Sequence, residues 1–316
     1  MSRKSPVRFP GDAKFAFTIL DDTDDSTVEN CKPVYDLLTT LGLRTTKTVW
    51  ALDTAPENQG PYFAGETMAR PAYREWVHEL ARMGFEIAFH NATMGTSTRD
   101  DTIAALDYLK SEFGRDVRLH CNHGQNLENL HWGSSRYHLL PLRLALSLWS
   151  RLRGHPRFSG ESPRSPYYWA DVAAERLSYI RAFAFNRLNC DRIAPGRAYR
   201  DKRRLDGPVY FNSADAPDVN AFSRLVNRET IDQLEAENGW AIVSTHLGKG
   251  FWYDGKLDAR FVDSMEYLAA RGGWYVPVSE LLDFLVQRYG SNELGYLQSR
   301  AMELAHFADR LRGRLH

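Results

Sequence analysis

The stretch FTILDDTDDST (residues 17–27) runs from an apolar segment directly into four carboxylates within five positions. Its apolar part is rich in β-branched and aromatic residues, which predicts a buried strand that begins at Lys14 and ends at Leu20. Adjacent carboxylates repel one another, so four of them at a strand end indicate that a positive group or a metal ion lies between them. The end of this strand is therefore the first candidate for a functional site.

Short apolar runs of the same kind recur along the chain and alternate with segments of helical spacing, which is typical of βα units around a parallel sheet or barrel. We predict strands at Lys14–Leu20, Thr45–Leu52, Phe85–Phe89, Val117–Cys121, Tyr179–Phe185, Val209–Phe211, Trp240–Thr245 and Trp274–Val276. Helices are predicted at 32–42, 71–84, 98–114, 219–239 and 258–273, and each of these segments ends at a glycine. A further helix is expected within 291–316, after the last strand.

Residues 124–178 interrupt this alternation after the fourth strand and are predicted to form an insertion of helix and loop that covers the site. Within it, PLRLALSLWSRLRG (residues 141–154) predicts an amphipathic helix. Its apolar face would carry Leu142, Ala145, Leu146, Trp149 and Leu152, and its polar face Arg143, Ser147, Ser150 and Arg151. Packing on the barrel wall is the preferred interpretation. Peripheral contact of residues 141–153 with an anionic membrane is the alternative.

The composition excludes several classes of protein. Lys+Arg and Asp+Glu both number 40 in 316 residues, and this zero net charge argues against a nucleic-acid partner. The chain has no apolar run of 18 residues and no secretory leader at its start, so we expect a cytoplasmic protein. Cys31, Cys121 and Cys190 are far apart and odd in number, which predicts reduced, structural thiols.

Polar residues gather where the predicted strands end. They are Asp21 and Asp22 after the first strand, His90 and Asn91 after the third, His120 and His123 at the fourth, Asp215 and Asp218 after the sixth, and His246 after the seventh. In parallel α/β folds ligands bind at the carboxyl ends of the strands, so these residues predict one shared site.

Other polar residues have simpler explanations. Asp24, Asp25, Ser26 and Thr27 are candidates for capping the helix that follows, and this is the preferred interpretation of Asp25. The remaining histidines are interpreted as surface or hydrogen-bonded residues; they are His78, His131, His138, His155, His306 and His316.

The opening stretch resembles the first motif of the aspartate-nucleophile phosphatases of the haloacid dehalogenase type, with Asp22, Asp24 and Ser26 at the required spacing. That resemblance implies a carboxylate that attacks phosphorus beside Mg²⁺. The acidic G-D-x-x-x-D element of that family is absent from the chain, and the histidines at the ends of three strands would have no role in such an enzyme.

A broader resemblance, over about residues 15–285, is to the NodB-like polysaccharide deacetylases. TILDD (18–22) is similar to their T-F-D-D motif, MGFEIAFHNATM (83–94) to their second motif as far as His90, and WAIVSTHLGKGF (240–251) to their last motif, which ends in a histidine. GLRTTKTVW (42–50) stands where the family has a further strand. This resemblance implies a single deformed (β/α) barrel of seven to eight parallel strands over residues 1–290, with a C-terminal helix over 291–316.

The same resemblance implies a metal-dependent hydrolase that removes an N-acetyl group from an amino sugar of a surface polysaccharide or its precursor. Asp21 would be the base, Asp22 and His90 would hold a divalent ion, most simply zinc, and His246 would protonate the departing amine. Met94 occupies the position of the family's second histidine, and His123 from the neighbouring strand end is the proposed replacement.

Asp215 or Asp218 would orient His246 in this scheme, and Asn91, His120 and Asp24 are candidates for orienting or binding the substrate. The aromatic and basic insertion, together with the basic run at 191–204, favours a nucleotide- or lipid-linked N-acetylated sugar. A glycan-binding or scaffold protein with a degenerate site is the non-enzymatic alternative.

Overall fold

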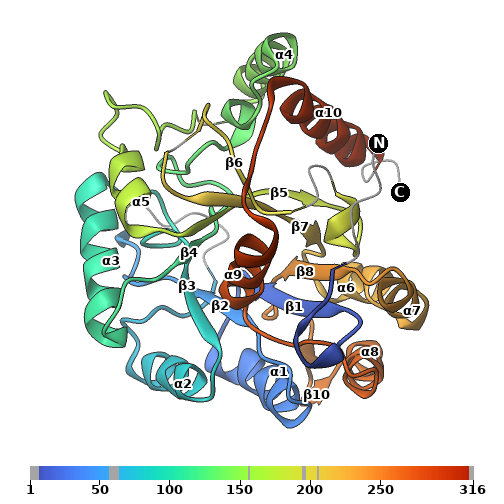
Figure 1. The fold of residues 1–316 in the computed structure, drawn as a ribbon. Helices are drawn as coiled ribbons and strands as arrows, with labels where there is room; N and C mark the ends of the chain where they lie inside the picture. The colour runs from blue at the N-terminus through green and yellow to red at the C-terminus, as the bar shows by residue number, and fades with distance from the viewer. Residues whose placement is uncertain (1–6, 57–63, 156, 194–196, 205, 313–316) are drawn as a thin grey trace.

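A computed structural model describes residues 7–56, 64–155, 157–193, 197–204 and 206–312. Within these residues seven parallel strands form a closed barrel (Figure 1). They are β1 (Ala16–Asp21), β2 (Thr46–Val49), β3 (Glu86–Phe89), β4 (Leu119–His120), β5 (Tyr179–Phe185), β7 (Val209–Asp215) and β8 (Trp240–Thr245). β1 pairs with β2 and β8, and β7 pairs with β5 and β8, which closes the ring. The predicted α/β barrel is confirmed.

Helices surround the barrel and one of them covers an end of it (Figure 1). They are α1 (Val28–Thr40), α2 (Pro71–Arg82), α3 (Arg99–Phe113), α4 (Leu140–Leu152), α5 (Ala170–Arg176), α6 (Val219–Leu225), α7 (Arg228–Ala236), α8 (Ala259–Ala270), α9 (Val278–Tyr289) and α10 (Tyr296–Arg312). Short 3-10 turns lie at Pro10–Asp12, Gly133–Arg136 and Cys190–Arg192. Small strands extend the sheet at β6 (Tyr199–Arg200) and β11 (Asn292–Glu293), and β9 (Trp252–Tyr253) pairs with β10 (Lys256–Leu257).

Three local predictions were wrong. The segment 219–239 forms α6 and α7 rather than one helix, because Asn227 caps a new helix through the amide of Thr230. The predicted strand Trp274–Val276 is reduced, within the described residues, to one bridge between Trp274 and Ala16. The N-cap of α1 is Thr27, which forms a capping box with Asn30, and not Asp25.

α9 lies across the end of the barrel where the strands begin (Figure 1). Its first amides bind side chains at the starts of β2 and β3: Val278 N–H donates to the Thr46 hydroxyl and Ser279 N–H to the Glu86 carboxylate. This end of the barrel is therefore covered, and the opposite end, where the strands finish, carries the polar residues predicted for the site.

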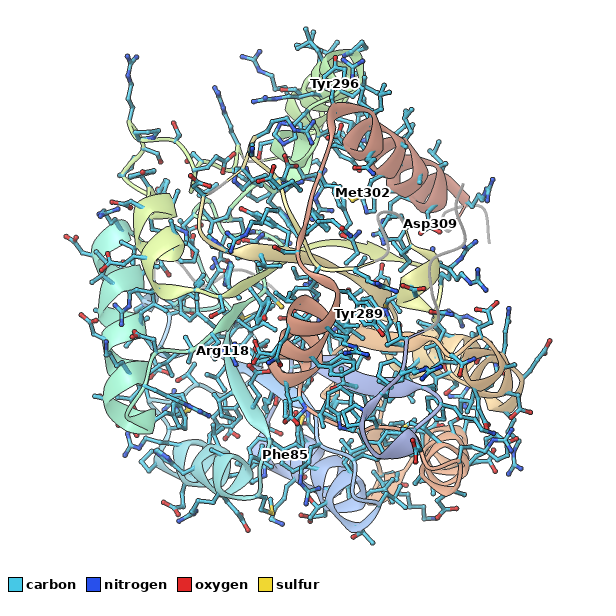
Figure 2. The ribbon with its side chains drawn as sticks, viewed as in Figure 1. Phe85, Arg118, Tyr289, Tyr296, Met302 and Asp309 are labelled. Carbon is cyan, nitrogen blue, oxygen red and sulfur yellow. The ribbon has the colours of Figure 1, made fainter. Side chains whose placement is uncertain are left out.

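The predicted insertion contains α4 and α5, and α10 packs beside it on the barrel. Figure 2 shows Met302 directed from α10 toward the barrel, where it is fully buried and accepts a hydrogen bond from Asn212 of β7. Cys31, Cys121 and Cys190 are buried free thiols. Over the described part of the chain, none of the helices combines the length and the apolar character needed to cross a membrane.

Candidate active site

The adjacent carboxylates Asp21 and Asp22 lie on opposite sides of the barrel wall, as the twofold alternation of a strand requires. Asp21 is fully buried outside the barrel interior and accepts hydrogen bonds from the Tyr35 hydroxyl at 2.9 Å, Lys47 Nζ at 3.0 Å and Leu247 N–H at 2.8 Å. It is not among the residues that line the cavity described next. This position does not suit the predicted role of Asp21 as a base for a water molecule in the site.

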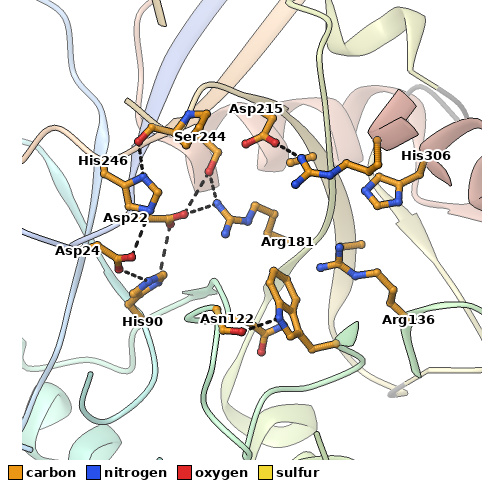
Figure 3. Close-up of a pocket in the computed structure, with 16 residues that line it drawn as sticks. Asp22, Asp24, His90, Asn122, Arg136, Arg181, Asp215, Ser244, His246 and His306 are labelled. Carbon is orange, nitrogen blue, oxygen red and sulfur yellow. Dashed lines mark hydrogen bonds and ion pairs between the residues drawn. The ribbon is translucent and has the colours of Figure 1, made fainter. Parts of the chain in front are cut away.

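A cavity of about 240 Å³ opens at the end of the barrel where the strands finish (Figure 3). Its lining residues come from β5, from the ends of β1, β3, β4, β7 and β8, and from the insertion and α10. They are Asp22, Asp24, His90, Asn122, Gly124, Trp132, Arg136, Arg181, Ala182, Ala184, Asp215, Pro217, Ser244, His246, His306 and Arg310. Four of the residues predicted at strand ends line this cavity: Asp22, His90, Asp215 and His246. The other five are not among its lining residues, and they are Asp21, Asn91, His120, His123 and Asp218.

Three imidazoles converge on the carboxylate of Asp24. His90 Nε2 lies 3.2 Å and His123 Nε2 3.6 Å from Asp24 Oδ1, whereas His246 Nε2 lies 3.4 Å from Oδ2. Lys249 Nζ is 3.5 Å from the same Oδ2. Asp24, interpreted above as a loop or orienting residue, is thus the centre of the cluster.

The other ring nitrogen of each of these histidines faces an oxygen acceptor. His246 Nδ1 is 2.7 Å from the Pro217 carbonyl, and His123 Nδ1 is 2.9 Å from the Asn126 amide oxygen. His90 Nδ1 lies 3.7 Å from Asp22 Oδ1. The hydrogen bonds at Nδ1 of His246 and His123 fix the direction in which Nε2 points, as such acceptors do for metal-binding histidines, whereas the 3.7 Å contact of His90 is too long for a hydrogen bond.

The charges of this cluster shift its pKa values in opposite directions. Burial by itself would raise the pKa of Asp24, but hydrogen bonds with His123, His246 and His90 hold it well below its usual range. Burial opposes the charged form of His123 and of His246, yet their bonds to Asp24 outweigh it and raise both pKa values. Burial does prevail at His90, whose pKa is lowered despite Asp22 and Asp24.

Asp22 points into the cavity and is held by Arg181 of β5. Arg181 Nη1 donates to Asp22 Oδ2 at 2.7 Å, and the Ser244 hydroxyl donates to the same oxygen at 3.3 Å. Asp22 Oδ1 and His90 Nδ1 face each other, and both are buried without a hydrogen-bond partner. Burial would raise the pKa of Asp22, but Arg181 lowers it, so Asp22 is a carboxylate at neutral pH.

The loops after β3 and β4 are joined by buried side-chain amides that position His123. Asn91, which adopts a positive φ of 63°, accepts the His123 N–H at 2.9 Å and donates to Glu128 at 2.9 Å and to Asn129 at 3.0 Å. His120 is buried and bonds to the Phe89 carbonyl and to Asn122. Asn91 and His120 therefore support the site from behind and do not contact Asp24.

Gly248 lets the loops of Asp24 and His246 approach each other. A Cβ at this position would lie 2.6 Å from the backbone carbonyl of Asp25, closer than real Cβ contacts come. Asn30 bridges the same two loops by donating to the carbonyls of Asp25 and Gly248 at 2.8 and 3.4 Å. The glycine of THLGKG is thus needed to bring His246 against Asp24.

The two aspartates predicted to orient His246 have other hydrogen-bond and ion-pair partners. Asp218 is the N-cap of α6 and accepts the Ala221 N–H. Asp215 lines the cavity but pairs with Arg310 of α10. His246 is oriented by the Pro217 carbonyl instead, and Met94 is not among the lining residues.

Sequence reasoning missed Arg181, Ser244, Arg136, Arg310 and His306 of this cavity. A signal existed for Arg181, because a charge inside the otherwise apolar strand YIRAFAF needs a buried counter-ion. Arg310 and His306 lie on α10, whose position against β5 and β7 no local pattern gives. His316 lies outside the described residues.

The donor set can be compared with the requirements of zinc. Among the described residues no group of three or more His, Cys, Asp or Glu side chains is arranged so that it could hold a metal ion, and the imidazoles contact Asp24 directly. Imidazole and carboxylate are nevertheless zinc ligands, and two ligands about 2.0–2.1 Å from a tetrahedral ion lie about 3.4 Å apart. The separations of 3.2 and 3.6 Å from Asp24 Oδ1 to His90 and His123 are close to that value. The donor types of Asp24, His90 and His123 and these two separations suit zinc, and a bound ion would have to replace the direct contacts of the imidazoles with Asp24.

Comparison with known proteins gives the fold. No family model and no curated protein matches the chain. Among solved structures, a putative polysaccharide deacetylase from Mycobacterium smegmatis matches at TM-score 0.52 and 12% identity, over 92% of this chain and 97% of that one. A probable polysaccharide deacetylase from Pseudomonas aeruginosa PAO1 matches at TM-score 0.55 and 11% identity, over 92% and 96%. Puue allantoinase matches at TM-score 0.53 and 11% identity, also over 92% and 96%. The chain therefore has the NodB-like (β/α)-barrel fold of the polysaccharide deacetylases.

Proposed function

We propose that this protein is a metal-dependent deacetylase that removes an N-acetyl group from an amino sugar of a surface polysaccharide or its precursor. The convergence of three imidazole Nε2 atoms on Asp24, each with its Nδ1 facing an acceptor, carries the proposal. Such an arrangement is typical of metal and acid–base sites and is not required by packing. The fold alone does not choose the substrate, since an allantoinase shares it.

Asp24, His90 and His123 are the residues that would hold the ion, because His90 and His123 approach the same oxygen, Oδ1. When bound, a divalent ion such as zinc polarises the acetamide carbonyl and lowers the pKa of the attacking water. His123 thus takes the place that Met94 leaves open. This assignment replaces Asp22 by Asp24 in the predicted ligand set.

Asp22 is the proposed general base. Its Oδ2 is held by Arg181 and Ser244, and its Oδ1 faces His90 Nδ1 at 3.7 Å and has no hydrogen-bond partner among the described residues. The ionised form that Arg181 favours is the form that accepts a proton from water. Asp22 therefore replaces Asp21, whose oxygens are occupied by Lys47, Tyr35 and the Leu247 amide.

His246 is the proposed proton donor to the departing amine. Its pKa is raised by Asp24 and Asp22 against the effect of burial, so it is protonated at a higher pH than an isolated imidazole. With Nδ1–H bound to the Pro217 carbonyl, its Nε2–H points into the cavity. An amide nitrogen leaves poorly without a proton, and His246 supplies it.

The test uses a chelated and then reconstituted enzyme with N-acetylated amino-sugar substrates, and it measures released acetate. We expect activity only after a divalent ion is returned. Loss of activity in His246→Asn, with the ion still bound, would show that His246 acts as the proton donor and not as a metal ligand. A protein that binds the sugar and the ion but never releases acetate would support the alternative of a glycan-binding scaffold. The phosphatase alternative predicts phosphate release instead.

We also propose that α4 contacts an anionic lipid surface, and that the substrate is lipid-linked. Leu144, Leu148 and Leu152 are 60%, 60% and 78% exposed along one face of α4, whereas Leu142 and Leu146 pack on the core. Arg143, Arg151 and Arg153 are exposed on the same helix, so its surface combines apolar and basic groups.

A groove of about 990 Å³ beside α4 supports the link between this surface and the site. It is lined by Arg143, Leu144, Arg151 and Trp132, and Trp132 also lines the cavity. Co-sedimentation with phosphatidylglycerol vesicles tests the contact. We expect binding by the wild type, weaker binding by Leu144→Ser/Leu148→Ser, and little binding to phosphatidylcholine alone. Equal sedimentation of both proteins would contradict it.

A further inference from the structure

The cavity has two chemically different ends. In Figure 3, Asp22, Asp24, His90 and His246 lie at one end and Arg136 and His306 at the other, with Arg181 between them. The reaction proposed above uses the first end. The second end is made by the insertion and by α10 and has no role in that reaction.

The charges around the cavity do not balance in pairs. Arg181 pairs with Asp22, and Arg310 pairs with Asp215. Arg136 lines the same cavity, but within the described residues no carboxylate pairs with it, and its Nε is buried without a hydrogen-bond partner. An uncompensated guanidinium in a partly enclosed site is costly and invites an anion.

The position of Arg136 is fixed by its surroundings. Its guanidinium lies 3.9 Å from the centre of the Trp132 ring and 5.5 Å from that of Phe183. Arg204 donates to the Arg136 carbonyl at 2.9 Å, and Arg204 is itself paired with Asp201. Arg136 is therefore held toward the cavity by stacking and by its backbone, which leaves its donors for a ligand.

The groups beside Arg136 are either positively charged or neutral. Burial and the charges of Arg204, Arg310 and Arg181 lower the pKa of Arg136 to about 10, against the opposite influence of Tyr137. Burial, Arg136 and Arg310 lower the pKa of His306 to about 2, so its imidazole is neutral. Tyr137 and His306 are joined through His306 Nδ1 at 2.7 Å. At neutral pH this end of the cavity carries an unpaired positive charge.

We propose that Arg136 binds an oxyanion of the substrate, a phosphate or carboxylate on the amino sugar, while the acetamide lies at Asp24. This inference rests on the proposed deacetylase function and specifies its substrate as an acidic N-acetylated sugar. A guanidinium fork can bind either oxyanion through two hydrogen bonds. The cavity volume of about 240 Å³ is smaller than the roughly 300–1,000 Å³ typical of sites for drug-sized ligands. A single charged sugar unit fits these two constraints.

Three probes distinguish the sources of the oxyanion: N-acetylglucosamine 1-phosphate, N-acetylmuramic acid, which carries a carboxylate, and neutral N-acetylglucosamine. The wild type should deacetylate one of the two acidic probes more efficiently than the neutral one. Arg136→Met should lower kcat/KM for that probe about 10- to 100-fold, mainly through KM, as expected when a charge-assisted contact is lost. The neutral probe should lose much less activity than the acidic probe, and Arg136→Lys should recover part of the loss.

Arg115→Met is the matched control, because Arg115 is an exposed arginine beside a different cavity. The melting temperature gives a second readout. Removing an unpaired guanidinium should not lower the melting temperature in Arg136→Met, whereas a purely structural arginine would. Equal losses for all three probes, or a wild type indifferent to their charge, would overturn the proposal.

Calorimetric titration with inorganic phosphate separates this proposal from the proposed function. Phosphate binding that is abolished in Arg136→Met, in a protein that releases no acetate, would retain the oxyanion site and reject the deacetylase. Acetate release with no Arg136-dependent phosphate binding and no preference for acidic probes would retain the deacetylase and reject the oxyanion site.

Discussion

The carboxylates of Asp21 and Asp24 are three residues apart in the chain and have opposite environments. Asp21 is fully buried against Lys47, Tyr35 and a backbone amide, so both of its carboxylate oxygens are hydrogen-bonded within the wall. The Asp24 side chain is 19% exposed, opens on the cavity and has titratable imidazoles as neighbours. A buried carboxylate with fixed partners is a structural element, whereas one surrounded by groups that change charge is equipped for chemistry.

The largest effect that this comparison predicts is at Asp24. Asp24→Asn should bring acetate release below detection, because the ligand charge on which His90, His123 and His246 converge is removed. Circular dichroism should show an unchanged fold, since the ion pairs of the Asp24 side chain among the described residues are with His90, His123, His246 and Lys249 and not with the core of the barrel. Measurable turnover by Asp24→Asn would place the chemistry elsewhere.

Asp22→Asn should distinguish a general base from a metal ligand inside the cavity. We expect kcat to fall by about 10²–10⁴-fold, the usual contribution of a general base, while the metal ion remains bound. Turnover and metal content measured on the same sample check this. Loss of the ion in Asp22→Asn would make Asp22 a ligand and not the base.

For Asp21, the comparison predicts that removing its buried partner lowers the stability of the fold. Lys47 and Asp21 are both fully buried and 3.0 Å apart, so Lys47→Met should leave an unpaired buried carboxylate and cost about 3–5 kcal/mol in the free energy of unfolding. The kcat of the folded fraction should change little. Urea unfolding measures the first quantity.

Lys32→Met is the matched control for Lys47→Met. Lys32 pairs with Asp36 at 2.8 Å on the surface of α1, with side chains 42% and 56% exposed, and its removal should cost less than about 1 kcal/mol. If both lysine variants unfold at the same urea concentration, the buried pair is not the structural element described here.

Acid should destabilise the fold through histidines that are buried as neutral rings. Burial lowers the pKa of His120 to about 3 and that of His306 to about 2, whereas both would titrate near 6.5 when unfolded. The unfolded state then binds more protons below pH 6.5, so stability is lost progressively as the pH falls toward 3. Each histidine should contribute about 2 kcal/mol of that loss between pH 7 and pH 5.

His306→Gln should flatten the dependence of unfolding free energy on pH by that amount, whereas His155→Gln, at an exposed histidine, is the control. Identical slopes for wild type and His306→Gln would show that His306 accepts a proton in the folded protein.

The sequence was sufficient for the parts of this structure that depend on local periodicity. Apolar runs located the seven barrel strands, and the polar residues that follow them predicted a site at the strand ends, where the structure has a cavity lined by Asp22, His90 and His246. The family resemblance predicts a histidine where this chain has Met94, and His123 was the predicted replacement. The structure places His123 beside Asp24.

The roles within LDDTDD could not be divided from sequence because they depend on the exact end of β1. Asp21 is the last residue of that strand, so alternation turns it outward, and Asp22 and Asp24 turn inward. The counter-ions are set by tertiary contacts that have no local signal: Arg181 meets Asp22 over 159 positions and Arg310 meets Asp215 over 95. Arg136 was overlooked because an arginine in a loop is usually solvated.

Equilibrium dialysis with zinc tests the central claim, that Asp24 and not Asp21 or Asp22 is the carboxylate that holds the metal. The wild type and Asp22→Asn should each bind a single zinc ion per chain, and folded Asp24→Asn should bind none. Zinc bound by Asp24→Asn as tightly as by the wild type would contradict the account.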